Sequence, residues 1–461
     1  MRTRWIAIAV CSAATAACAI GPNYHRPAVD VGRHYAEARG WTPSTPGRLE
    51  PAAWWRIYRD PVLDGLEQRV GASNPTVASA AAAVAQARAL VREARAGFWP
   101  TVTANFGRDR TTTVAGSRTL NSAGLAGTWD IDVWGRTRRE VESSAASAEA
   151  AAAALAATRL SVRAELATDY FALRAQDRLV ALLADTVVAD RQALAITESR
   201  YRYGVAAAAD VVSARTQLLA SESQQVNAGV QRALLVHAIA VLLGVPPSRF
   251  SIAPAPLSAV IPVVPAGVPS ALLQRRPDVA EAERRVAAAN AQIGVARAAF
   301  FPSLQLTGSG DYSSGVVATL LRASNLVWAF GPQVSQTVFA GGLLRAQAAA
   351  ARAAYDASVA DYRQAVLSAV QQVEDDLATL RILQRQASLA RRTVEQAREA
   401  QALTLDQYKA GVVPYSSVIS AQTTTLASRE TALNVRVNRL TASVSLIAAL
   451  GGGWDAGALA R

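Results

Sequence analysis

The sequence is short of several residue types, and each shortage excludes a class of protein. Only two of the 461 residues are cysteine, Cys11 and Cys18, and both lie near the start, so the body of the chain has no disulfide framework. After this N-terminal segment, no run reaches the roughly twenty apolar residues that a membrane-spanning helix needs. No glycine-rich loop follows a strand pattern, and no serine or cysteine nucleophile motif occurs. We therefore expect neither an enzyme nor a helical membrane protein.

Charged residues and metal ligands are distributed without any dense cluster. The net charge of +12 comes almost entirely from arginine, since Lys409 is the only lysine. The arginines are scattered beside Glu and Asp, which favours solvated helix faces over a nucleic-acid surface. The three histidines, His25, His34 and His237, have no partners at metal-ligand spacing. We therefore expect no metal and no non-covalent cofactor.

Residues 1–17 have the pattern of a signal peptide. Arg2 and Arg4 precede an apolar core, and small residues lead to Cys18. Residues 15–18, TAAC, resemble the lipobox of bacterial lipoproteins, in which the cysteine thiol accepts a diacylglycerol and becomes the mature N-terminus. Thr15 stands where that motif usually has leucine, and the alternative is an ordinary signal peptide cleaved at an Ala-x-Ala-like site. We expect a covalent lipid on Cys18 that anchors an extended, proline-bearing arm over residues 18–60.

Two later stretches contain no helix breaker over an unusual length. Residues 343–410 have neither proline nor glycine, and they predict a helix about 100 Å long. This helix turns at Gly411 and returns to residue 450, and a similar run from Arg136 turns at Gly204. Apolar residues at alternating spacings of four and three predict coiled-coil seams on both arms of the second hairpin: Val359, Tyr362, Val366, Ala369, Val373, Leu377 and Leu380, then Leu433, Val437, Leu440, Val444 and Ile447. Such hairpins favour a rod or a tube over a compact core.

The chain repeats once. Pro75 matches Pro277 at a separation of 202 positions, whereas Gly204 matches Gly411 at a separation of 207. The pattern divides the chain into repeat 1 over 61–250, a linker over 251–269, repeat 2 over 270–453 and a C-terminal tail over 454–461. Each repeat reads helix, two strands, long helix, turn, long helix, with strand pairs at about 101–133 and about 303–339.

The predicted strands alternate apolar and small polar residues. Residues 101–106 and 128–133 alternate clearly, and so do residues 303–307, whereas a return strand over 330–339 is less regular because Gln336 falls in the apolar register. The pattern fits strands of a membrane β-barrel, but a soluble antiparallel sheet with one wet face produces the same pattern, and the pattern alone favours the soluble sheet. The signal peptide and lipid anchor favour the membrane. Since four strands cannot close a barrel, several chains must contribute.

Taken together, these motifs resemble the TolC-like outer membrane efflux proteins, and in particular their NodT-like lipoprotein branch in tripartite pumps. The resemblance covers nearly the whole mature chain, and five segments carry it: Cys18 with GPNYHRP at 21–27, DVWGR at 132–136, RRPDV at 275–279, FAGG at 339–342 and AALGGGW at 448–454. It implies an α+β membrane protein in which a homotrimer forms a twelve-stranded outer membrane β-barrel, four strands per chain, continuous with a periplasmic α-helical barrel. An equatorial region around the helices would be built from the N-terminal arm, the linker and the C-terminus.

The resemblance also implies a function and site residues. The protein would be a passive conduit that carries small toxic compounds from an inner membrane transporter and a periplasmic adaptor to the exterior of a Gram-negative bacterium. The turns, at Gly204 and Val205 and at Gly411 and Val412, would be adaptor-docking tips. The periplasmic gate would contain Asp210, Tyr408, Ser417 and Ser420, where the two serines stand at positions that carry aspartate in many relatives, and Val413 stands in place of a frequent arginine. We expect this constriction to be less acidic than in those relatives.

Two other functions remain possible on these residues. One is an outer membrane duct for secreted proteins, against which the lipobox and the terminal LGGGW motif argue. The other is a periplasmic coiled-coil scaffold that is held to the membrane only by its lipid and has no channel.

Overall fold

The computed structural model describes residues 19–38, 53–257, 260–262, 264 and 269–457. Cys18, the predicted signal peptide and part of the predicted arm lie outside the described residues. The chain forms two compact units, each built from three segments. Unit 1 comprises Met1–Val29, Ala82–Ala153 and Ala280–Ala365, and unit 2 comprises Asp30–Ala81, Ala154–Val279 and Val366–Arg461.

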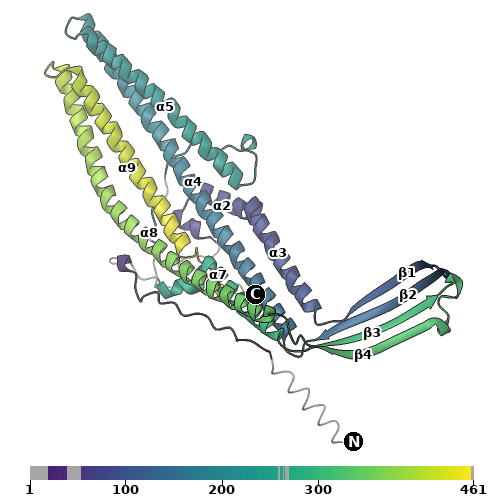
Figure 1. Cartoon of the computed structure of the whole chain (residues 1–461). Helices are drawn as coiled ribbons and strands as arrows, with labels where there is room; N and C mark the ends of the chain where they lie inside the picture. Colours follow the sequence, from purple (N-terminus) through teal and green to yellow (C-terminus); the bar gives the residue numbers. More distant parts are fainter. Residues whose placement is uncertain (1–18, 39–52, 258–259, 263, 265–268, 458–461) are drawn as a thin grey trace. The chain divides into compact units, whose positions relative to one another are not determined.

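Unit 1 contains a four-stranded antiparallel sheet in the order β1-β2-β3-β4 (Figure 1). Its strands are β1 (Thr101–Thr113), β2 (Gly116–Ile131), β3 (Ser303–Ser314) and β4 (Leu326–Ser335). The β1–β2 connection is a turn of two residues, 114 and 115, and Gly116 follows it with a φ of +124°. The β3–β4 connection is longer and contains two short 3-10 helices. The strands therefore come from both sequence repeats and meet in one sheet.

The last strand differs from the sequence prediction. We predicted a return strand over residues 330–339, but β4 covers Leu326–Ser335, so Gln336 and Phe339 lie beyond its end. In the observed register the alternation holds over most of β4, although Val327 lies on the opposite face, because five apolar even-numbered residues share one face: Leu326, Trp328, Phe330, Pro332 and Val334. The predicted irregularity came from a wrong boundary.

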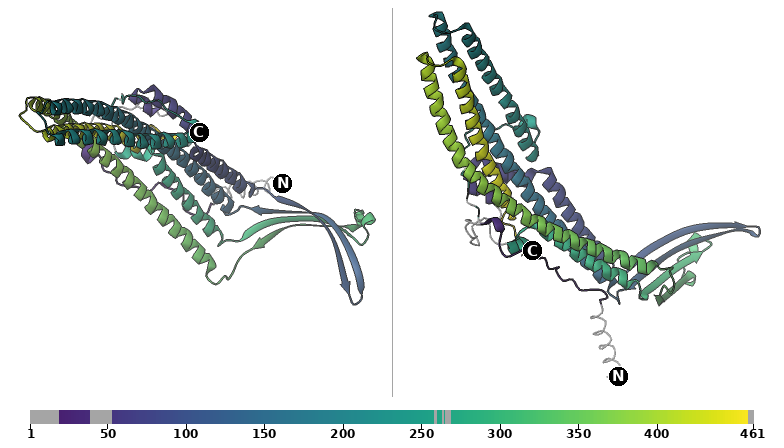
Figure 2. Two further views of the ribbon diagram at one scale, coloured as in Figure 1. Left: turned by 90° about the horizontal axis from the view of Figure 1, so that it is seen from above. Right: turned by 60° about the vertical axis from the view of Figure 1, so that its left-hand side comes forward.

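Long helices form the rest of the fold (Figures 1 and 2). Each repeat has a short helix before its strands, α3 (Pro75–Ala96) or α7 (Pro277–Ala298), and two long helices after them. The long helices are α4 (Arg136–Arg202), α5 (Ala208–Leu242), α8 (Leu343–Lys409) and α9 (Tyr415–Ala449), with α2 (Pro61–Ser73) and the single-turn α6 (Leu272–Arg275) preceding the short ones. α4 and α8 have 67 residues each, and α5 and α9 have 35 each. The corresponding helices of the two repeats therefore have equal lengths, as the sequence repeat predicts.

No helix in the described part of the chain is both long enough and apolar enough to cross a membrane.

The starts of α2 and α3 follow from their capping residues. Asp60 precedes Pro61, and its carboxylate accepts hydrogen bonds from the backbone N–H groups of Val62 and Leu63 at 3.0 and 3.1 Å. Before Pro75, the side-chain amide oxygen of Asn74 accepts hydrogen bonds from the N–H groups of Thr76 and Val77. In both cases the proline occupies the first helical position, where its missing N–H has no intrahelical partner to lose.

The predicted seam on α8 is buried. Six of its residues, Tyr362, Val366, Ala369, Val373, Leu377 and Leu380, are at most 8% exposed. On α9 the seam is buried only in the second half, at Leu440, Val444 and Ile447. The period of 3.5 residues therefore identified the packed face of these helices correctly over most of its length.

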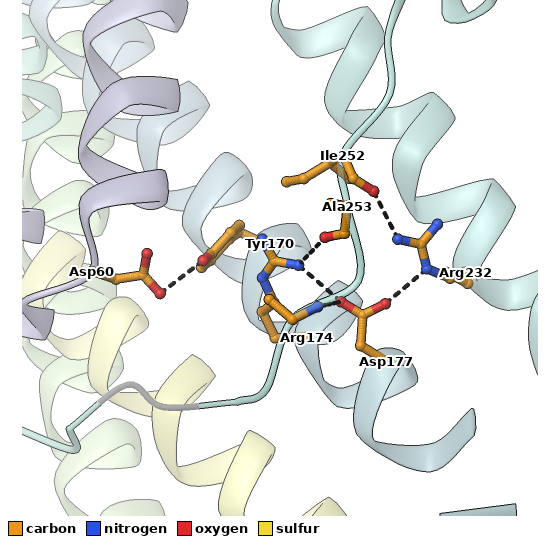
Figure 3. Close-up of polar contacts among 8 residues, drawn as sticks. Asp60, Tyr170, Arg174, Asp177, Arg232, Ile252 and Ala253 are labelled. Atoms are coloured by element: carbon orange, nitrogen blue, oxygen red, sulfur yellow. Dashed lines mark hydrogen bonds and ion pairs between the residues drawn. The ribbon is translucent and has the colours of Figure 1, made fainter. Parts of the chain in front are cut away.

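A buried ionic cluster attaches the linker to the pair α4 and α5 within unit 2 (Figure 3). The Asp177 carboxylate accepts hydrogen bonds from Arg174 at 2.8 Å and from Arg232 at 2.7 Å. The same two guanidinium groups donate to the backbone carbonyls of Ala253 and Ile252, both at 2.8 Å. Asp177 also accepts from the N–H of Ala255 at 3.0 Å. One carboxylate thus joins two helices and the linker.

In the same unit, α2 buries a carboxyl group without a partner. Glu67 is fully buried, and neither of its carboxyl oxygens accepts a hydrogen bond from the described residues. Burial raises the pKa of Glu67 to about 9, although the positive charge of Arg163 opposes this shift. The group is therefore neutral at pH 7, which removes most of the cost of burying it.

Candidate gate at the two helical hairpin turns

The two hairpin turns have the same backbone geometry. After α4, the N–H of Gly204 donates to the carbonyl of Tyr201 and the N–H of Val205 to that of Arg200, both at 2.9 Å. After α8, Gly411 and Val412 repeat these bonds to Tyr408 and Gln407 at the same distances. This pairing is the Schellman motif, in which the residue at C′ takes a positive φ. The φ angles of +72° at Gly204 and +80° at Gly411 explain why both turns have glycine there.

The residue that follows each glycine is exposed. Val205 and Val412 have exposed fractions of 63% and 72%, and the nearby Tyr203 has 82%. Apolar side chains at the tip of a helical hairpin gain nothing from the fold of the chain itself, so they are available for contact with another protein.

Behind the exposed tips, a small apolar cluster joins the two hairpins. Tyr408 and Tyr415 are 3% and 1% exposed, and their ring centroids are 5.2 Å apart. They pack with Val418 of α9 and with Ala193 and Ala214 of the first hairpin. The four long helices therefore share one buried contact beside the turns.

Polar contacts of α4 complete this cluster. The guanidinium of Arg200 lies over the Tyr408 ring at 4.9 Å from its centroid, and its Nη1 donates to the carbonyl oxygen of Lys409 at 2.6 Å. The Tyr408 hydroxyl donates to Oγ1 of Thr197 at 3.3 Å. Arg200 thus binds a carbonyl at the C-terminal end of α8, where the helix dipole favours a positive charge.

A buried carboxylate on α4, that of Asp190, lies near this cluster. Asp190 is 1% exposed and accepts a hydrogen bond of 2.6 Å from the Ser221 hydroxyl. Burial raises the pKa of Asp190 above its ordinary value. Burial also raises the pKa of Tyr415 to about 12, and the carboxylates of Asp190 and Asp210 add to that shift. Asp190 and Asp210 are therefore both near Tyr415.

The predicted gate residues lie in different environments. Tyr408 is at the centre of the cluster, and Asp210 lies half-buried in the first turn of α5, where the helix N-terminus favours a carboxylate. Ser417 is half-buried and Ser420 is exposed, and both lie in the first turns of α9. The structure therefore brings Tyr408 and Asp210 close to Tyr415, whereas the two serines remain outside the buried contact.

Sequence reasoning missed Arg200, Thr197, Tyr415 and Asp190. Tyr415 had a usable signal, because it lies seven residues after Tyr408 across a turn that folds back on itself. Arg200 resembles any other helix-surface arginine, so nothing in the sequence distinguishes it. Chemically, the arrangement is a noncovalent clasp between two hairpins. It is held by the charged hydrogen bond from Arg200 to Lys409, the stacking of Arg200 on Tyr408 and the hydrogen bond from Tyr408 to Thr197.

Comparisons with known proteins agree with this architecture. The family model described as outer membrane efflux protein matches residues 66–245 and 268–452, one segment in each repeat. The toluene efflux pump outer membrane protein TtgC of Pseudomonas putida is 29% identical over 464 residues, covering 97% of this chain and 95% of that protein. The pyoverdine export outer membrane protein OpmQ of Pseudomonas aeruginosa is 33% identical over 420 residues, covering 87% of each chain.

A solved structure has the same fold. The outer-membrane channel OprN superposes with a TM-score of 0.87 at 29% identity, covering 95% of this chain and 100% of that one.

Proposed function

The chain belongs to the outer membrane efflux protein family, and from this premise we propose that it is the passive outer membrane conduit of a tripartite efflux pump. The observation that carries the proposal is the family match to both repeats, together with the fold shared with OprN over 95% of the chain. This is a channel and not an enzyme. The match to the channel fold favours this function over the lipid-anchored scaffold.

The proposed homotrimer is supported by surfaces that one chain leaves open. β1 and β4 are the edges of the sheet, with unpaired backbone groups that lipid cannot satisfy. Three copies would join these edges into a twelve-stranded barrel. On the helices, exposed apolar residues recur mostly at intervals of seven on α5 and α8, which lie on the two outer sides of the hairpins (Figures 1 and 2): Val212, Leu219 and Val226, then Ile382, Leu389 and Leu403. Such stripes suit a coiled-coil contact between neighbouring copies.

The lipid on Cys18 is part of the proposal. A diacylglycerol on the mature N-terminus would place residues 19–38 against the inner surface of the outer membrane. Hydrogen bonds attach this arm to helix α8 in each unit. In unit 1, Arg26 donates to the Tyr362 hydroxyl at 3.2 Å, and in unit 2 the carboxylate of Glu374 accepts from the N–H groups of Ala36 and Glu37.

The hairpin turns form the periplasmic gate in this proposal. Gly204, Val205, Gly411 and Val412 would be the tips that contact a periplasmic adaptor, which in turn recruits the inner membrane transporter. Asp210, Tyr408, Ser417 and Ser420 would surround the constriction. The clasp between Arg200 and Lys409 supports this role, because it is the kind of contact that must change if the two hairpins separate.

The exported compounds are proposed to be small and organic. The relatives are named for export of toluene and of pyoverdine, and their likeness to this chain extends over nearly its whole length. The site offers no cargo-specific pocket among the described residues of the gate, so we expect selection to lie in the transporter.

The experiment that tests the function is purification of the full-length protein from outer membranes, followed by mass measurement and planar-bilayer recording. A trimer that conducts ions is the expected result. A monomeric protein without conductance would overturn the proposal. Labelling with palmitate, with Cys18→Ser as the control, tests the lipid anchor independently.

A further inference from the structure

The sheet of unit 1 has one strongly apolar face. The register aligns the even-numbered residues of β1, β3 and β4 with the odd-numbered residues of β2. Most of the exposed large side chains of the strands lie on this face, with exposed fractions of 40–83%: Val102, Phe106, Leu125, Leu326, Trp328, Phe330 and Val334. Val327 and Leu120 lie on the other face. The opposite face is mostly small or polar and contains Thr101, Asn105, Ser122, Thr307 and Ser309. This is the arrangement of strands with lipid on one side and water on the other.

The apolar band has a definite height. It extends along β3 from Leu304 to Tyr312, a span of nine residues and eight steps, which is about 27 Å along the strand at about 3.4 Å per step. The apolar band of outer membrane strands is about 25 Å tall. Tyr312 and Phe106 belong to its last row, at the end of the sheet remote from the helices.

Two arginines follow immediately beyond this last row on the same face. Arg108 lies opposite Asn121, and Arg110 lies opposite Thr119, so both continue the register of Val102 and Phe106. Both are exposed, and none of the ion pairs in the described part of the chain includes either of them. Asp109 lies between them in sequence but on the opposite face. The arginines therefore have no acidic neighbour on their own face of β1.

We propose that Arg108 and Arg110 bind the phosphate groups of anionic lipid headgroups at the outer surface of the membrane. A guanidinium matches a phosphate with two parallel N–H donors, and side chains two residues apart on a strand are about 7 Å apart, a spacing that fits neighbouring phosphates. The position one to two rows beyond the apolar band is the level at which headgroups lie. This inference rests on the proposed membrane location of the strands.

Arg118 provides a matched control within the same hairpin. It lies opposite Thr111, and so on the opposite face of the sheet from Arg108 and Arg110. It is also exposed. An effect of positive charge at the hairpin in general would be shared by Arg118, whereas binding of lipid phosphates on the apolar face would not.

The test is a titration of the purified full-length protein in detergent with a diphosphorylated lipid A, with bound lipid counted by native mass spectrometry. A basic residue near an anionic lipid surface contributes about 1 kcal/mol, so we expect about fivefold weaker binding for R108Q or R110Q and about 25-fold weaker binding for the double variant. R118Q should bind as tightly as the unsubstituted protein. Equal affinity of the double variant and R118Q would overturn the inference.

Two further measurements distinguish lipid binding from binding of free phosphate, and the failure of this inference from the failure of the proposed channel. Inorganic phosphate should compete poorly, and displacement of the lipid by phosphate alone would instead indicate a free-anion site and contradict the proposal. Planar-bilayer conductance of R108Q/R110Q should equal that of the unsubstituted protein. Because lipid binding is measured separately, a conducting protein without the lipid effect refutes this inference alone, whereas a protein that does not conduct refutes the proposed channel.

Discussion

The guanidinium of Arg200 donates a hydrogen bond of 2.6 Å to the carbonyl oxygen of Lys409, although 209 residues separate them in sequence. The bond connects the last turn of α4 to the end of α8, beside the two glycine turns. Together with the hydrogen bond from Tyr408 to Thr197, it is a polar contact through which the first hairpin holds the second at the proposed gate.

Removal of this contact should favour the open gate. Arg200→Ala deletes a charged hydrogen bond and the cation–π contact with Tyr408, which together contribute about 1–2 kcal/mol at a partly exposed site. We expect a larger mean conductance in planar bilayers. Arg202→Ala removes an exposed arginine at the same helix end and is the control. Equal conductance of the two variants would show that the clasp does not restrain the gate.

The constriction should be only weakly blocked by multivalent cations. Hydroxyl groups at Ser417 and Ser420 hold cations less strongly than a ring of carboxylates does. Ser417→Asp should therefore strengthen block in planar-bilayer recordings, and Asp210→Asn should weaken what block remains. Strong block in the unsubstituted channel that Asp210→Asn leaves unchanged is the contrary outcome.

The pH dependence of stability should contain a contribution from Glu67. Its ordinary pKa of 4.5 rises to about 9 in the fold, so the folded protein holds a proton that the unfolded chain releases. This stabilisation is fully present below about pH 4.5 and is lost progressively as the pH rises to about 9. Glu67→Gln stays neutral at all of these pH values. The difference between its thermal midpoint and that of the unsubstituted protein should therefore increase, in favour of the variant, as the pH rises from about 5 to about 8.

An exposed carboxyl provides the comparison for Glu67. Glu93→Gln makes the same chemical change on the exposed face of α3. Its midpoint should follow that of the unsubstituted protein across this pH range. Parallel profiles for all three proteins would mean that Glu67 does not bind its proton more tightly in the fold.

Removal of Asp177 should destabilise the protein severely. Asp177→Ala leaves Arg174, itself 2% exposed, without its carboxylate and removes the acceptor of the Ala255 N–H in the linker. Loss of one partner of a buried ion pair costs about 3–5 kcal/mol. Asp185→Ala removes an exposed aspartate of the same helix and should change the free energy of unfolding by less than about 0.5 kcal/mol. Denaturation monitored by circular dichroism measures both, and similar losses would contradict a special role for Asp177.

Local rules account for most of the elements but not for their ends. The absence of proline and glycine from residues 343–410 is enough to predict α8, and the glycine at each turn is enough to predict where the hairpins reverse. The boundary of β4 was wrong, because a strand end depends on where its partner β3 ceases to pair and not on its own residues.

The sequence by itself determined the twofold repeat, the lengths of the helices, the two glycine turns and the alternation of the strands, because each is encoded by residues that are neighbours in the chain. The tertiary structure alone decided which distant residues meet. Nothing local distinguishes Arg200 from Arg202, or Arg108 from Arg118, since one differs from the other only in the partner or the face that the packing assigns to it. The burial of Glu67 and the clustering of Asp177 with two arginines likewise depend on helices that approach one another only after the chain has folded.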